Sequence, residues 1–268
     1  MNKKSMKREI TIALKSRYEF VRRFVPLFQE NWSEQHYIYD LPYRIREVLH
    51  LLTHVSISPP AQVLEIGTGG GGLLAYSLSK LGYKVIGVNH NCSVECDNDN
   101  LRKGFPNLEV YCFSIGQEPI PRKSQTFDLI VCNHTIEHLH MTPKFLLKEI
   151  TRLLKTGGWV YISNPNAGRL MARLRPILGR RYYPLSIEKH FENFGQPTHT
   201  GHVREFSPSE LYYMIARAGF RNIKSGTFNN LFRHVYKPRS RWYGARAVAL
   251  ATALFPPLRD TAYVVAQK

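Results

Sequence analysis

Cysteine is scarce in this chain, and no stretch of it is long and apolar. The 268 residues include 4 cysteines, none in a Cys-x-x-Cys pair, which argues against a disulfide scaffold and a common zinc site. The longest apolar run, Ala247 to Phe255, is too short to cross a bilayer, and the N-terminus lacks the apolar core of a signal peptide. We therefore expect a cytoplasmic protein, with at most a peripheral contact to the inner face of a membrane.

Acidic residues are also few. The chain carries 37 Lys and Arg against 20 Asp and Glu, for a net charge of +17. Two stretches, 166–187 and 211–259, contain no acidic residue. Such one-sided blocks favour an anionic partner, namely phospholipid headgroups, a phosphorylated substrate or nucleic acid. A basic surface that only aids solubility would give the same pattern.

What the chain has in their place is an alternation of short β-branched runs with helical segments. Strands are expected over 62–66, 84–88, 108–113, 127–132, 159–163, 221–225 and 261–267, and helices over 73–81, 143–154 and 207–219. Ser207 and Glu210 can cap the last helix, and Gly219 can end it. The alternation predicts an α/β fold with a doubly wound, Rossmann-like, mostly parallel sheet.

Other segments fall outside this alternation. Residues 1–58 are expected to form an N-terminal helical extension or lid, and 59–268 the α/β domain. Within that domain we expect an insertion at about 166–206, after the fifth strand, and a basic apolar segment at about 231–258.

The first expected strand runs directly into a glycine-rich turn, Val63-Leu64-Glu65-Ile66-Gly67-Thr68-Gly69-Gly70-Gly71. Glycines allow positive φ and close approach of the backbone to a ligand. Their spacing fits a dinucleotide and S-adenosylmethionine equally well. Glu65 favours the second, because a carboxylate repels a pyrophosphate but pairs well with the ammonium of an amino acid moiety.

Three later segments match a known family in order. They are Phe127–Leu139 (FDLIVCNHTIEHL), Leu147–Asn166 (LLKEITRLLKTGGWVYISNPN) and Gly201–Leu211 (GHVREFSPSEL) followed by Ala218-Gly219-Phe220. With the glycine turn, they resemble class I S-adenosylmethionine-dependent methyltransferases, especially the ubiquinone-biosynthesis O-methyltransferase-like group, over about residues 60–228. The resemblance implies methyl transfer and a seven-stranded sheet whose last strand runs antiparallel.

The resemblance also implies a set of residues that bind the cofactor: Glu65, Gly67, Thr68, Gly69, Gly71, Asn89, Ser114 and Asn133. Two of them depart from the family pattern. Asn89 stands where the family usually has an acid that holds both ribose hydroxyls, and Ser114 lies where an Asp near the adenine is common. A neutral amide makes weaker hydrogen bonds than a carboxylate, so we expect a weaker grip on the cofactor.

Histidines supply the candidate catalytic groups. Methyl transfer to an oxygen is an in-line displacement that positioning and a general base can assist. His134 and His138 follow the fourth expected strand, where open α/β sheets bind ligands, and His202 lies in the insertion. Each could equally be a structural histidine. Glu137, His138 and His140 match no zinc spacing, so we expect no metal, although some ubiquinone-type relatives use a divalent cation.

Three functions remain open at this point. The first is methyl transfer to a small-molecule, lipid-linked or glycan acceptor, with the Arg-apolar segments near 170–178 and 245–258 suited to a membrane interface. The second is RNA methylation. The positive charge favours it, but the sequence shows no separate RNA-binding module, which argues against it. The third is a non-catalytic binding protein with a methyltransferase fold.

Overall fold

A single mixed sheet organises the molecule. The computed structural model describes residues 47–68, 73–90, 109–179, 202–229, 250–252 and 254–268. The strands lie in the order β3-β2-β1-β4-β5-β7-β6, and β7 is antiparallel to both of its neighbours. Their bounds are β1 Gln62–Ile66, β2 Lys84–His90, β3 Glu109–Phe113, β4 Phe127–Asn133, β5 Leu154–Pro165, β6 Arg221–Phe228 and β7 Thr261–Gln267.

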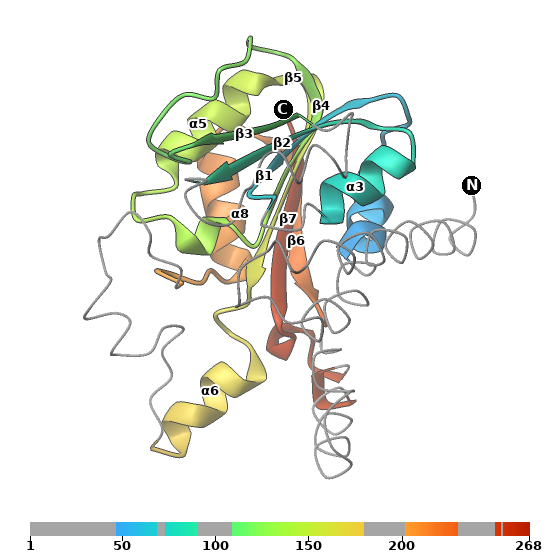
Figure 1. Ribbon diagram of the computed structural model, residues 1–268. Helices are drawn as coiled ribbons and strands as arrows, with labels where there is room; N and C mark the ends of the chain where they lie inside the picture. Colours follow the sequence, from blue (N-terminus) through green and yellow to red (C-terminus); the bar gives the residue numbers. More distant parts are fainter. Residues whose placement is uncertain (1–46, 69–72, 91–108, 180–201, 230–249, 253) are drawn as a thin grey trace, which may run out of the picture.

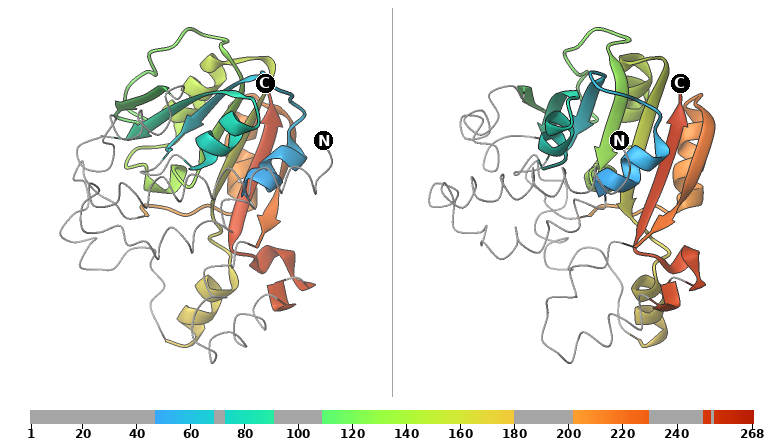
Figure 2. Two further views of the ribbon diagram at one scale, coloured as in Figure 1. Left: turned by 45° about the vertical axis from the view of Figure 1, so that its right-hand side comes forward. Right: turned by 90° about the vertical axis from the view of Figure 1, so that its right-hand side faces the viewer.

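Helices cover both faces of this sheet (Figures 1 and 2). The helical residues 47–54 and α3 (Leu73–Lys80) bury their apolar side chains against one face. The other face packs against α5 (Lys144–Leu153) and α8 (Pro208–Arg217). Because successive strand residues point to opposite faces, Val63 joins the first cluster and Leu64 the second. The expected doubly wound, mostly parallel α/β fold is confirmed.

The central strands follow the sequence closely. Every residue of β4 except Asp128 is buried, as expected for a parallel strand covered on both faces. The α8 cap is also as predicted, because the Ser207 and Glu210 side chains form a reciprocal capping box. β5 is longer than expected: it begins at Leu154, directly after α5, and the positive φ of Gly157 lets the chain turn within it.

The peripheral segments are described in part. Residues 1–46 of the expected extension lie outside the described residues, as do 180–201 of the expected insertion and 231–249 of the basic segment. The described parts include α6 (Leu170–Ile177) and two 3-10 turns, η2 (Ile136–His138) and η4 (Pro256–Leu258). Among the residues described, no helix has the length and apolarity needed to cross a membrane.

Candidate functional site

Most of the predicted site residues lie in or just after the last residues of strands that end at one edge of the sheet. Ile66 pairs with Val88 of β2 and with Cys132 of β4, so the next residues, Gly67, Asn89 and Asn133, are level with one another. Ser163 of β5 pairs with Asn133 and extends this row. The chain order reverses between β1 and β4, and ligands of open α/β sheets bind at the carboxyl ends of strands at such a switch point.

Gly67 allows the turn after β1 to pass close to β4. Its φ is +81°, and a Cβ at this position would lie 1.8 Å from Oγ1 of Thr135. Thr135 itself donates to the carbonyl of Ile66 over 3.1 Å, while the Gly67 and Thr68 amides donate to the Val88 carbonyl. The turn is therefore fixed to β2 and to the residues after β4, and a side chain at position 67 has no room.

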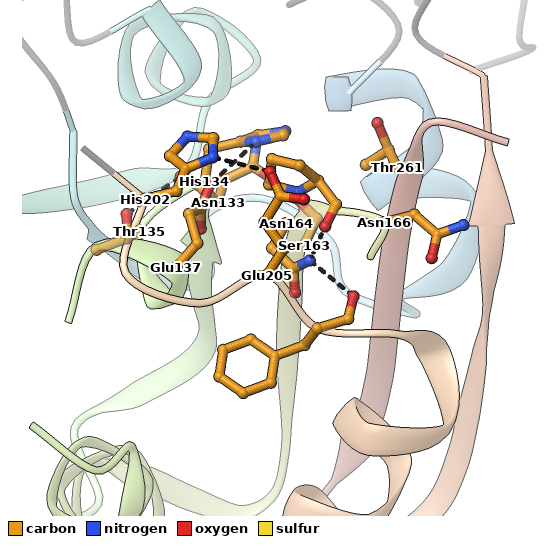
Figure 3. A network of polar contacts seen from close by, with 12 residues as sticks. Asn133, His134, Thr135, Glu137, Ser163, Asn164, Asn166, His202, Glu205 and Thr261 are labelled. Atoms are coloured by element: carbon orange, nitrogen blue, oxygen red, sulfur yellow. Dashed lines mark hydrogen bonds and ion pairs between the residues drawn. The ribbon is translucent and has the colours of Figure 1, made fainter. Parts of the chain in front are cut away.

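A buried ion cluster follows β4, and Figure 3 shows two of its members, His134 and Glu137. His134 places Nε2 2.8 Å from Glu47 and Nδ1 3.4 Å from Glu137, and both carboxylates are almost completely shielded from solvent. Burial alone would lower the pKa of His134, but the two carboxylates outweigh it and raise the pKa to about 9. The imidazole is thus a cation at neutral pH, with both ring nitrogens directed at carboxylates.

The other two candidate histidines lie side by side. The rings of His138 and His202 meet edge to face, with centroids 4.7 Å apart. Nδ1 of His202 lies 3.0 Å from Oε1 of Glu205, which is almost completely buried. Arg169 binds both carboxylate oxygens of Glu205. His202 is therefore held in place from behind by a buried carboxylate that an arginine fixes in turn.

Backbone contacts bring these histidines together from distant parts of the chain. The amides of Val203 and Arg204 both donate to the carbonyl of Glu137, which ties the segment before α8 to η2. On the other side, Nδ2 of Asn164 donates to the carbonyl of Phe206 over 2.9 Å. His202 is thereby placed between the ends of β4 and β5.

Comparisons with known proteins identify the family of the chain. The family model described as "Methyltransferase domain" matches residues 37–225. The chain belongs to this methyltransferase family. Among curated relatives, the ubiquinone biosynthesis O-methyltransferase of Burkholderia thailandensis is 29% identical over 178 residues, covering 65% of this chain and 71% of the relative.

Solved structures share the fold of this methyltransferase. A possible histamine N-methyltransferase from Thermotoga maritima aligns with a TM-score of 0.54 at 19% identity, over 94% of this chain and 99% of that one. An S-adenosylmethionine-dependent methyltransferase from Mesorhizobium loti gives 0.56 at 14% identity, over 86% and 98%. The family and the curated relatives make this chain an S-adenosylmethionine-dependent methyltransferase, and these structures support its architecture.

The described residues of the methyltransferase fit its cofactor. Glu65 is buried at the end of β1, which suits it to an ammonium group. The Thr68 hydroxyl oxygen is shielded from solvent and has no hydrogen-bond partner within the described part of the chain, so it can accept or donate to a ligand. Asn89 lies in this row near the end of β2, paired with Cys112 of β3, and Ser114 directly follows β3. Gly69 and Gly71 lie outside the described residues.

One residue predicted to bind the cofactor, Asn133, already uses part of its side chain within the protein. Asn133 is buried, and its side-chain oxygen accepts a hydrogen bond from the Ser163 hydroxyl. Its role in cofactor binding is therefore restricted to its remaining groups.

A metal ion would have a different set of ligands from the one the sequence suggested. Ligand atoms of Glu137, His138 and His202 all lie within 4.8 Å of one another, whereas His140 is not part of this group. These side chains fit a divalent cation, which would hold and polarise an acceptor oxygen there. His202 joins Glu137 and His138 only through the fold, since it lies far from them in sequence.

Sequence reasoning missed the groups that hold the histidines. Glu47, Arg169 and Glu205 each contact a histidine or the carboxylate behind it, yet none of them was assigned a role. Glu205 was the easiest to find, because it lies three residues after His202 in a segment already singled out. Glu47 gave no signal, since an acid in a helical stretch is ordinary.

Proposed function

We propose that this methyltransferase methylates an oxygen of a small-molecule acceptor and that His202 is its general base. One observation supports this choice: Nδ1 of His202 lies 3.0 Å from the buried carboxylate of Glu205. A carboxylate that accepts from Nδ1–H leaves the lone pair on Nε2, the arrangement a histidine base needs.

The other histidines are less suited to this role. His134 faces a carboxylate with each ring nitrogen and carries a positive charge, so it has no lone pair to offer. We assign it to holding the helical residues 47–54 against the end of β4. His138 packs edge to face on His202 and positions its ring.

The chemistry follows from these positions. Bound S-adenosylmethionine supplies a methyl group on a sulfonium. Nε2 of His202 accepts the proton of the acceptor hydroxyl, and Glu205 stabilises the imidazolium that results. Arg169 is a positioning residue, because it contacts Glu205 and not the reacting atoms.

We propose that the cofactor is held by Glu65, Gly67, Thr68, Gly69, Gly71, Asn89, Ser114 and Asn133. The carboxylate of Glu65 would take the ammonium, and the amide of Asn89 would bind the ribose. Thr68 is supported by its buried hydroxyl without a partner in the described chain.

The acceptor class rests on the relatives. Their names specify an O-methyltransferase, which favours a hydroxyl such as that of a phenol. A lipid-linked or glycan hydroxyl has the same chemistry and is included. The extension over 1–58 and the insertion at about 166–206 would contribute the walls that select among these acceptors.

A methyl-transfer assay with a panel of phenols and sugars tests this proposal. His202→Ala should lower kcat by about 100-fold or more, because a general base contributes on that scale, while the cofactor Kd stays unchanged. Added imidazole should restore part of the rate to this variant. Glu205→Gln should lower kcat with little effect on KM, and His140→Gln is the matched control.

Several outcomes would contradict the proposal. Full activity of His202→Ala would show that His202 is not the general base. Activity that disappears with a chelator and returns with Mg²⁺ would make His202 a metal ligand in place of a base. Methylation of RNA but of no small molecule would show that the acceptor is a nucleic acid and not a small molecule.

A further inference from the structure

An acid from the N-terminal part of the chain is buried at the candidate site. Glu47 is 1% exposed and is the first of the helical residues 47–54. Its Oε1 lies 2.8 Å from Nε2 of His134, which directly follows β4. The neighbouring Val48 and Leu51 pack in the core, so the helix has apolar contacts of its own. Because desolvation offsets much of the attraction in a buried ion pair, stability alone does not explain Glu47.

The backbone at His134 is in a conformation that residues with side chains rarely adopt. Its φ is +50°, in the left-handed region, and its amide donates to the carbonyl of Ser163 over 2.9 Å. Such a conformation persists only where the surrounding contacts hold it, and it is concentrated at functional sites. The imidazole lies between Glu47 and Glu137, at 2.8 and 3.4 Å. Glu47 is the nearer acid and therefore the stronger restraint on the ring.

The more distant acid, Glu137, also lies beside the other two histidines. It is fully buried, and apart from the contact with His134 neither of its side-chain oxygens has a hydrogen-bond partner in the described part of the chain. One of these oxygens lies within 4.8 Å of a ring nitrogen of His138 and of one of His202. A buried carboxylate in this state is drawn strongly to a nearby cation. Without Glu47 to hold the ring, the carboxylate and the imidazole of His134 would close on each other.

The backbone of Glu137 carries the segment that contains His202. The amides of Val203 and Arg204 donate to the carbonyl of Glu137 over 2.7 and 3.2 Å. The ring of His138, the next residue after Glu137, packs edge to face on the ring of His202. Figure 3 shows Glu137 together with His134 and His202. A movement of Glu137 would therefore reach His202 through the main chain and through a ring contact.

We propose that Glu47 is a positioning residue for methyl transfer. It holds the ring of His134 and thereby keeps Glu137 in place beside His202. Glu47 acts through these side chains and not on the reacting atoms. Its effect on the rate rests on the proposed function, in which His202 is the base, whereas its effect on the position of His202 does not.

Side-chain NMR of the histidines in the full chain tests the position of His202. Its imidazole signal is identified by its loss in His202→Ala. The signal should shift in Glu47→Gln, because the amide has the shape of the acid but no charge to hold the cation. It should return in part in Glu47→Asp, which restores the charge. Calorimetric titration with S-adenosylmethionine confirms that each variant is folded.

The matched control is His54→Gln, which removes the contact between His54 and Tyr263 on the same helix and leaves Glu47 in place. If the effect is specific to Glu47, this control should leave the His202 signal where it is in the wild type. An unchanged signal in Glu47→Gln would overturn the proposal. So would an equal shift in the control, since it would show that any loosening of the helix has the same effect.

A double-mutant cycle in the methyl-transfer assay tests the consequence for the rate, with the phenol that the wild type methylates fastest as the probe. Glu47→Gln should lower kcat by roughly tenfold or more and leave the acceptor KM unchanged, because a small misplacement of a reacting group is costly. In the His202→Ala background it should have no further effect. Losses that multiply would overturn the proposal. Full activity of His202→Ala would instead contradict the proposed base, and the NMR result would still decide the position of His202.

Discussion

At the scale of single residues, charge decides what each histidine can do. His134 lies between two buried carboxylates and is cationic, whereas His202 has one carboxylate behind it and is more exposed. The sequence places both near the end of the sheet but gives no sign of this difference. The partners that create it, Glu47 and Glu205, come from other segments.

The cluster around His134 makes stability depend on pH. The pKa of His134 is raised from 6.5 to about 9 in the folded protein by Glu47 and Glu137, against the effect of burial. A raised pKa contributes stability that is fully present below pH 6.5 and is lost as the pH rises through about 9. The contribution is about 3 kcal/mol, because the pKa rises by roughly 2.5.

Urea unfolding of the wild type and His134→Gln checks this prediction. The difference in free energy of unfolding should be largest near about pH 6 and should shrink by about 3 kcal/mol toward about pH 10. The same difference at both pH values would mean that the imidazole is neutral in the folded protein.

At the scale of elements, the contact between the turn after β1 and the residues after β4 determines the geometry of the switch point. Gly67→Ala should destabilise the protein by about 3 kcal/mol or more, since its Cβ would overlap Thr135 in addition to the unfavourable φ. Gly157→Ala is the control, because its φ is +77° but its Cβ would meet nothing within 4 Å. That variant should cost only about 1 kcal/mol.

Thermal or urea unfolding of the two variants separates the cost of the steric overlap from the cost of the backbone conformation. Their difference isolates the overlap with Thr135 from the backbone conformation. Equal losses would show that the turn relaxes away from β4 at little cost.

Most elements could be predicted from local pattern. β4 is an unbroken apolar run, and α8 carries its own capping box, so both were found within a residue or two. β5 was predicted too short, because Gly157 and Gly158 looked like a boundary and are in fact a turn inside the strand. Contacts such as Glu47 with His134 join residues far apart in sequence, and no local pattern encodes them.

At the scale of the whole molecule, the predicted site residues come together at one end of the sheet. The parallel strands deliver Gly67, Asn89 and Asn133 to that end, and β5 continues from it into α6. The fold thereby brings the proposed cofactor site and the proposed base to one edge.

Calorimetric titration with S-adenosylmethionine tests the central claim most directly, namely that this edge binds the cofactor. We compare the wild type with Glu65→Gln and with Glu118→Gln, an exposed acid that serves as the control. The wild type and Glu118→Gln should bind alike, and Glu65→Gln should bind about tenfold or more weakly, because a buried carboxylate pairs strongly with an ammonium. A folded wild type that does not bind, or a Glu65→Gln variant with unchanged affinity, would contradict the account.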